Sequence, residues 1–78
     1  MEKQLEKNIQ TLIAEHFSVE AGKTDNLYLL GLMPRDIVKL VYLIESKFNI
    51  QFSESELTQD TFDNIANIVS AINLCMKK

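Results

Sequence analysis

The chain has 78 residues, of which 46% are hydrophobic and 24% are charged, and its net charge is −3. This composition is that of an ordinary globular protein, and it predicts one folded domain over residues 1–78. The acidic balance argues against nucleic acid as a partner, since phosphate binding needs a clustered positive surface. We find no signal peptide and no apolar run long enough to span a membrane, so we expect a cytoplasmic protein with no membrane partner.

The first predicted helix extends from the N-terminus to about residue 17. Its apolar residues recur at helical spacing and form one face, made by Leu5, Ile9, Leu12, Ile13 and Phe17. The strong helix breakers follow, at Gly22, Gly31 and Pro34. They predict a long loop over residues 18–33. The four leucines at positions 27, 29, 30 and 32 are too many for a solvated linker, so we expect the loop to pack on the core.

The second predicted helix begins at Pro34, because proline suits the first helical position, where its missing N–H is not needed. Asp36 in the first turn and Lys47 in the last complement the helix dipole. The predicted buried face is Ile37, Leu40, Val41, Ile44 and Phe48. Val38 and Tyr42 form a second apolar strip, which indicates either more core or a contact site for a partner.

Two further helices are predicted in the rest of the chain. Ser53 and Glu56 have the spacing of a capping box, which predicts a short helix that ends near Gln59. Thr61 is a candidate N-cap for the last helix, with Asp63 in its first turn. Its predicted buried face is Phe62, Ile65, Ala66, Ile68, Val69, Ile72 and Met76, and Lys77 and Lys78 end it. The predicted fold class is therefore all-α, a bundle of three long helices and one short helix without strands.

The sequence carries no catalytic or metal-binding motif. One histidine and one cysteine cannot form a zinc site in the usual way, and no glycine-rich phosphate loop or nucleophile elbow occurs. We therefore expect neither an enzyme nor a bound metal.

Four segments together resemble acyl carrier proteins, the superfamily that carries a phosphopantetheine arm. Residues 30–41 (LGLMPRDIVKLV) are similar to the segment in which Leu-Gly-x-Asp-Ser-Leu opens the second helix of that family. Residues 44–50 (IESKFNI) resemble the end of that helix, residues 52–54 (FSE) the connection after it, and residues 61–65 (TFDNI) the start of the last helix. The resemblance covers residues 5–74 and implies a carrier-protein-like bundle with a long loop between the first and second helices.

The chain departs from the family pattern where the arm is attached. In that family a serine at the start of the second helix carries phosphopantetheine, and the position that matches it here is Pro34, after Met33 in place of aspartate. Proline has no nucleophilic atom to modify. No serine or threonine lies between Thr24 and Ser46, so no neighbouring side chain replaces it. The resemblance therefore implies a divergent, carrier-related protein without the attachment serine and without a cofactor.

A second departure concerns charge. The family usually presents an acidic second helix to its enzymes, whereas the charges of residues 34–48 nearly cancel. We expect protein partners, namely pathway enzymes, to dock on the second helix with less dependence on charge. The candidate partner-binding residues are Met33, Arg35, Val38, Lys39 and Tyr42.

The leading functional hypothesis is a non-catalytic, monomeric carrier-like protein that acts as a docking or scaffolding partner. The enzymes that it positions would belong to an acyl-transfer or peptide-modification pathway, including peptide maturation. Three alternatives remain: a genuine acyl or peptidyl carrier with a displaced attachment site, an unrelated small structural or oligomerising bundle, and non-covalent lipid binding between the helices. The sequence identifies neither the partner nor the pathway.

Overall fold

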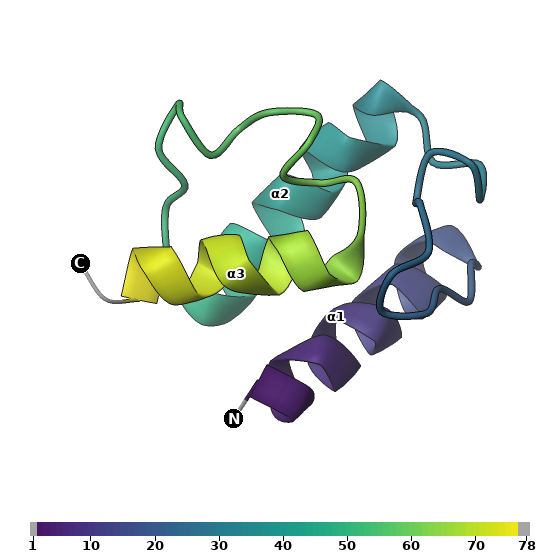
Figure 1. Cartoon of the computed structure of the whole chain (residues 1–78), viewed down its shortest axis with the longest axis horizontal. Helices are drawn as coiled ribbons and strands as arrows, with labels where there is room; N and C mark the ends of the chain where they lie inside the picture. Colours follow the sequence, from purple (N-terminus) through teal and green to yellow (C-terminus); the bar gives the residue numbers. More distant parts are fainter. Residues whose placement is uncertain (1, 77–78) are drawn as a thin grey trace.

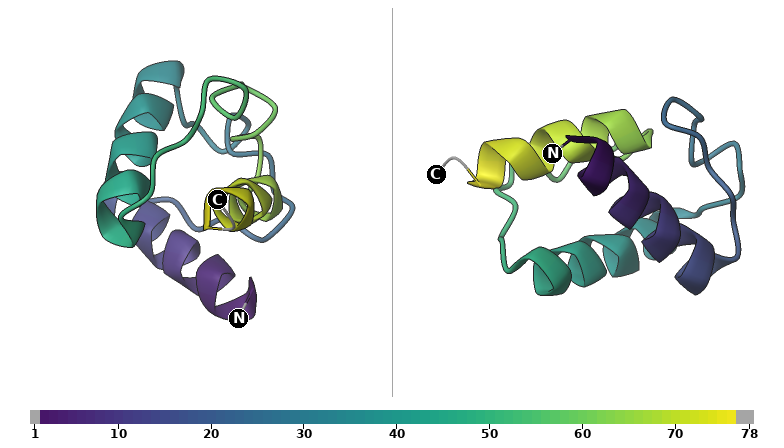
Figure 2. Two further views of the ribbon diagram at one scale, coloured as in Figure 1. Left: turned by 90° about the vertical axis from the view of Figure 1, so that its left-hand side faces the viewer. Right: turned by 90° about the horizontal axis from the view of Figure 1, so that it is seen from below.

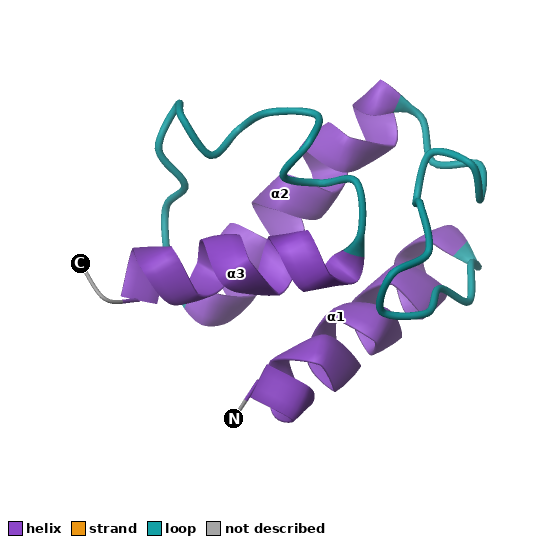
Figure 3. Ribbon diagram, viewed as in Figure 1, coloured by secondary structure: helices purple, strands orange, loops and turns teal. Residues whose placement is uncertain are grey.

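The structure is a computed structural model that describes residues 2–76. It contains the helices α1 (Glu2–Phe17), α2 (Pro34–Phe48) and α3 (Ile65–Met76), and residues 2–76 form no strand (Figures 1 and 3). The all-α prediction is confirmed. Lys77 and Lys78, which were predicted to end the last helix, lie outside the described residues. No helix in the described part of the chain has the length and apolar character needed to cross a membrane.

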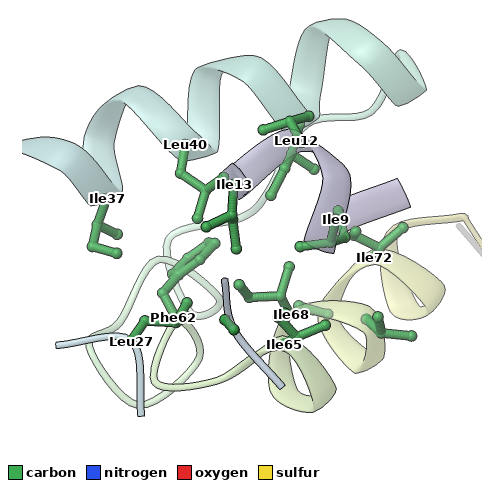
Figure 4. Packing of buried hydrophobic residues seen from close by; sticks show 14 of the residues in the cluster. Ile9, Leu12, Ile13, Leu27, Ile37, Leu40, Phe62, Ile65, Ile68 and Ile72 are labelled. Carbon is green, nitrogen blue, oxygen red and sulfur yellow. The ribbon is translucent and has the colours of Figure 1, made fainter. Parts of the chain in front are cut away.

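The helices cross one another obliquely and enclose a single hydrophobic core (Figures 1 and 2). Each helix points isoleucine or leucine side chains into it, and the connecting segments contribute further residues, among them Leu27 and Phe62 (Figure 4). The most deeply buried of these side chains are Ile9, Ile13, Leu27, Leu40, Ile44, Phe62, Ile65, Ile68 and Ile72. Burying one such side chain stabilises the fold by about 1.5–3 kcal/mol.

The segment 18–33, between α1 and α2, is tied to the start of α3. The backbone N–H of Leu27 donates to the carbonyl of Asp63 at 2.7 Å, and that of Ala66 donates to the carbonyl of Lys23 at 3.1 Å. The Asn26 side chain accepts hydrogen bonds from the N–H groups of Tyr28 (2.9 Å) and Leu29 (3.1 Å). These bonds satisfy backbone groups that have no helical partner.

Only two of the four loop leucines are in the core. Leu27 and Leu32 are buried, as predicted, but Leu29 is 86% exposed and Leu30 is 39% exposed. The loop is therefore attached to the core through two of its leucines, and the other two face outward. The reason is the tight turn over residues 26–31, which ends at Gly31 with a φ of 110° and turns the middle leucines outward.

The first turn of α2 is built as the sequence predicts. Pro34 takes a first-turn position after the extended Met33, and the Asp36 carboxylate accepts a hydrogen bond from the Met33 N–H at 2.9 Å. Lys47 lies in the last turn, and the helix is capped by Asn49, whose φ of 54° is in the left-handed region. Local signals of this kind set the two ends of α2.

The predicted short helix after Phe52 is not a helix in the structure. Ser53 donates to the Glu56 carboxylate through its N–H (2.9 Å) and its hydroxyl (2.7 Å), but this capping interaction is followed by one turn only, closed by the Leu57 N–H to the Ser53 carbonyl. The Thr58 hydroxyl then accepts the Thr61 N–H at 3.2 Å. Such side-chain bonds compete with helical ones and keep the segment in turns.

The last helix starts later than predicted. Its N-cap is Asn64, whose side-chain oxygen accepts the Asn67 N–H at 2.8 Å, and its first residue is Ile65. The assignment of Thr61 as the cap, with Asp63 in the first turn, is therefore wrong. Asp63 instead supplies its carbonyl to the loop. Phe62 is buried although it precedes the helix, whereas Met76, predicted to be buried, is 51% exposed.

Candidate functional site

The outward side of α2 carries an exposed apolar pair. Val38 and Tyr42, four residues apart, are 70% and 67% exposed, so the interpretation that they belong to the core is wrong. Met33, at the start of the helix, is also half exposed. We call Met33, Arg35, Val38, Lys39 and Tyr42 together the α2 face, and all five side chains are exposed. The structure therefore brings the sequence-predicted partner residues together on one surface.

The charges of α2 nearly cancel in number, but its cationic and anionic side chains differ in placement. Arg35 and Lys39, four residues apart, are on the α2 face. Arg35 is one turn before Val38, and Lys39 is one turn before Tyr42. Asp36 is half-buried, and its carboxylate bonds to the Met33 N–H. The sequence alone suggested a nearly neutral surface, but the exposed ionic groups of the α2 face are cationic.

Glu45, the second carboxylate of α2, is also held by the backbone. Its Oε2 accepts a hydrogen bond from the Phe52 N–H at 2.9 Å, and the side chain is half-buried. Lys39, by contrast, is exposed, with its ammonium group 5.9 Å from the centre of the Phe17 ring. This cation–π contact keeps Lys39 over the helix surface without neutralising its charge.

An apolar cavity of about 390 Å³ lies beside the α2 face, between α2 and the segment 57–62. Val38 belongs to both the face and the cavity wall, and Leu57 lies on the opposite side, 47% exposed. Phe62 and Val41 are further wall residues. A concave apolar surface of this size accommodates a small ligand or a large apolar side chain.

Tyr28 contributes a polar group to the cavity wall. Its hydroxyl donates to the Gln59 carbonyl at 3.5 Å, a long hydrogen bond between the first loop and the 57–62 segment. Burial of the phenol, together with the nearby Asp63 and Asp60 carboxylates, raises the pKa of Tyr28 above 10.0. Tyr28 therefore stays neutral near pH 7 and adds no charge to the cavity.

Sequence reasoning missed the cavity and two of its residues, Tyr28 and Leu57. A signal for Leu57 was present, because it is the one apolar residue within residues 53–61 (SESELTQDT). A lone leucine in a polar connection is either buried or part of an exposed apolar site. Tyr28 had no comparable signal, since the contact with Gln59 joins residues 31 positions apart.

Pro34 lies in the first turn of α2 and forms part of the cavity wall. The position that the family resemblance matches to the attachment serine is thus at the edge of the candidate site, with a side chain that cannot be esterified. Within residues 2–76, no group of three or more histidine, cysteine, aspartate or glutamate residues is arranged to hold a metal ion.

The fold is similar to that of solved carrier-protein complexes. No family model and no curated protein matches the sequence. One structural match is a chain from the Bradyrhizobium japonicum glycine:[carrier protein] ligase complexed with its cognate carrier protein and an analogue of glycyl adenylate, with a TM-score of 0.74 and 19% identity over 94% of this chain and 96% of that chain. A second is from the same ligase with glycylated carrier protein, with a TM-score of 0.71 and 18% identity over 90% and 96%.

These coverages mean that the matched chains are nearly the same length as this one, which fits the carrier proteins in those complexes. At 18–19% identity the similarity concerns the fold. The chain therefore has the acyl-carrier-like fold of a small helical carrier protein.

Proposed function

We propose that this chain is a carrier-like docking protein without a phosphopantetheine arm, which positions enzymes by protein contact and catalyses no reaction itself. The observation that carries the proposal is Pro34 in the first turn of α2, beside the exposed Val38 and Tyr42. The position that the resemblance matches to the attachment serine has no hydroxyl, and the helix surface next to it carries exposed apolar side chains. Proline at that position also fixes a helical φ, so the replacement preserves α2.

The solved structures of similar fold support protein partners in general, because in them a ligase is complexed with a carrier protein. For this chain we propose partners among the enzymes of an acyl-transfer or peptide-modification pathway. Exposed apolar side chains surrounded by polar ones are typical of protein interaction sites. The α2 face has this arrangement, and we propose that the partner docks there.

Intact-mass measurement after incubation with coenzyme A and a broad-specificity phosphopantetheinyl transferase tests the absence of the arm. An ordinary carrier protein, treated in parallel, is the positive control. We expect the mass of this chain to remain unchanged. A gain equal to one phosphopantetheine group would overturn the proposal and identify the chain as a genuine carrier with a displaced attachment site.

A further inference from the structure

We infer that the α2 face and the adjacent cavity bind a helix of a partner protein that carries an apolar anchor side chain flanked by carboxylates. The inference rests on the proposed function, because it presupposes a protein that docks on α2, and it adds the chemistry of that protein. It depends on three features: the placement of charge on α2, the connection between face and cavity, and the helical character of the surface, which has no strand edge within residues 2–76.

The charge of the α2 face is opposite in sign to that of the chain. The whole protein has a net charge of −3, yet Arg35 and Lys39 are the ionic side chains beside Val38 and Tyr42. The two carboxylates of the helix are half-buried and bonded to backbone N–H groups. A basic area on an acidic protein favours an acidic partner surface and disfavours a basic one.

The cavity provides a place for an anchor. Val38 is shared between the face and the cavity wall, so a partner that covers the face reaches the cavity at the same time. Leu57, on the far side of the cavity, is 47% exposed. A partner bound in the cavity would bury this apolar side chain. Binding energy in protein interfaces is concentrated in apolar side chains that fill such pockets. Carboxylates beside the anchor would then lie over Arg35 and Lys39.

The fold also indicates the conformation of the partner segment. Residues 2–76 form no strand, so this part of the chain offers no sheet edge to which an extended peptide could add. The surface instead consists of one side of α2 and the turns over residues 57–62, and Val38 and Tyr42 repeat at helical spacing. An amphipathic helix, whose anchors also repeat every three to four residues, fits this surface.

Two synthetic helical peptides test the inference with the full chain. Both carry the same leucine and phenylalanine anchors four residues apart, and the flanking positions are glutamate in one peptide and lysine in the other. Binding is followed by ¹H–¹⁵N NMR titration at low and at high salt. We expect the glutamate peptide to bind roughly tenfold more tightly at low salt, with shifts at residues 33–42 and 57–62, and the preference to shrink at high salt.

Two charge-reversed variants sharpen the test. Arg35→Glu/Lys39→Glu should reverse the preference between the peptides. Lys7→Glu/Lys47→Glu changes the net charge by the same amount at exposed positions outside the α2 face, and it should leave the preference in place. Equal affinity for the two peptides, preference for the lysine peptide, shifts elsewhere or no binding of either peptide would each overturn the inference. A small apolar molecule found in the purified chain by native mass spectrometry would also overturn it, because the cavity would then be occupied.

Failure of the inference and failure of the proposed function give different results. If the coenzyme A assay leaves the mass unchanged while the peptides show no charge preference, the arm-free docking protein stands and only the partner chemistry is wrong. A mass gain in the coenzyme A assay would overturn the proposed function, whichever of the two peptides binds.

Discussion

The backbone N–H of Leu27 donates a hydrogen bond of 2.7 Å to the carbonyl of Asp63, and this bond joins the first loop to the residues that precede α3. Asn26 reinforces the junction, because its amide group lies 3.4 Å from the Asp63 carboxylate while its oxygen accepts two backbone N–H groups. The loop is therefore a fixed part of the fold, and it positions Tyr28 against the segment 57–62.

We expect Asn26→Ala to lower the free energy of unfolding by about 1–3 kcal/mol, because the Tyr28 N–H loses its acceptor in a partly buried site and the Leu29 N–H loses its acceptor at an exposed one. Urea unfolding followed by circular dichroism measures the change. Thr24→Ala, at an exposed position of the same loop, is the control and should change stability by less than about 0.5 kcal/mol. Equal effects of the two substitutions would mean that Asn26 does not hold the loop.

Substitutions along α2 should separate its two faces. Val38→Ala and Tyr42→Ala, made singly, should each change the free energy of unfolding by less than about 0.5 kcal/mol, since both side chains are mostly exposed. Leu40→Ala should cost about 2–5 kcal/mol, because Leu40 is fully buried in the core. Thermal and urea unfolding of the three variants provide the comparison. A large loss of stability in Val38→Ala or Tyr42→Ala would place those residues in the core and remove the basis of the α2 face.

Introducing the carrier-protein pattern at residues 33 and 34 should preserve the fold and allow only slow modification. We expect Met33→Asp/Pro34→Ser to remain folded, because an N-cap carboxylate gains about 0.5–2 kcal/mol while loss of proline costs about 0.4–1 kcal/mol. The new hydroxyl should accept phosphopantetheine slowly, since the resemblance implies enzymes that expect an acidic second helix. Intact mass over time, with an ordinary carrier as reference, measures the rate.

Adding Arg35→Glu and Lys39→Glu to that variant should raise the rate of modification, because the α2 face then matches the acidic helix of the family. The Lys7→Glu/Lys47→Glu pair serves as its charge-matched control and should leave the rate unchanged. Rapid modification of Met33→Asp/Pro34→Ser before any charge reversal would show that the cations of the α2 face do not oppose recognition.

The raised pKa of Tyr28 predicts a loss of stability in alkali. In the unfolded chain this phenol ionises near its ordinary pKa of 10.0, whereas burial and then the Asp63 and Asp60 carboxylates keep it protonated to higher pH in the folded state. The folded state therefore binds more protons above pH 10, and stability falls as pH rises from there toward the folded pKa; below pH 10 the contribution is fully present. Urea unfolding between pH 9 and 11 measures this dependence.

Tyr28→Phe should make that decline in stability with pH less steep than in the unmodified chain. Tyr42→Phe, which removes a phenol from the exposed α2 face, is the control and should retain the original dependence. If the two variants show the same pH dependence as the unmodified chain, the Tyr28 phenol is not responsible for the alkaline loss.

The helices differ in how well their first residues could be predicted from the sequence. The start of α2 was predictable because Pro34 and Asp36 act within one turn of the chain. The start of α3 was not, since both Thr61 and Asn64 are cap-type residues and the choice depends on tertiary bonds. The Asp63 carbonyl is used by Leu27, and the Asp60 carbonyl accepts the Asn67 amide at 3.1 Å. Distant partners therefore decide between two locally equivalent starts.

The candidate site, too, was only partly predictable from the sequence. The helical repeat of Val38 and Tyr42 was visible in the sequence, and so was the proline at position 34, which the resemblance matches to the attachment serine. The positive character of the α2 face was not, because counting charges cannot show that Glu45 is held by the Phe52 N–H. The cavity could not be predicted either, since its walls meet only when the segment 57–62 folds back beside α2.

The bonds from Leu27 to Asp63 and from Ala66 to Lys23 also constrain when the protein can fold during synthesis. The first loop cannot take this arrangement before residues 63–66 are available to it. A chain truncated before residue 63 should therefore remain unfolded and exposed to proteases.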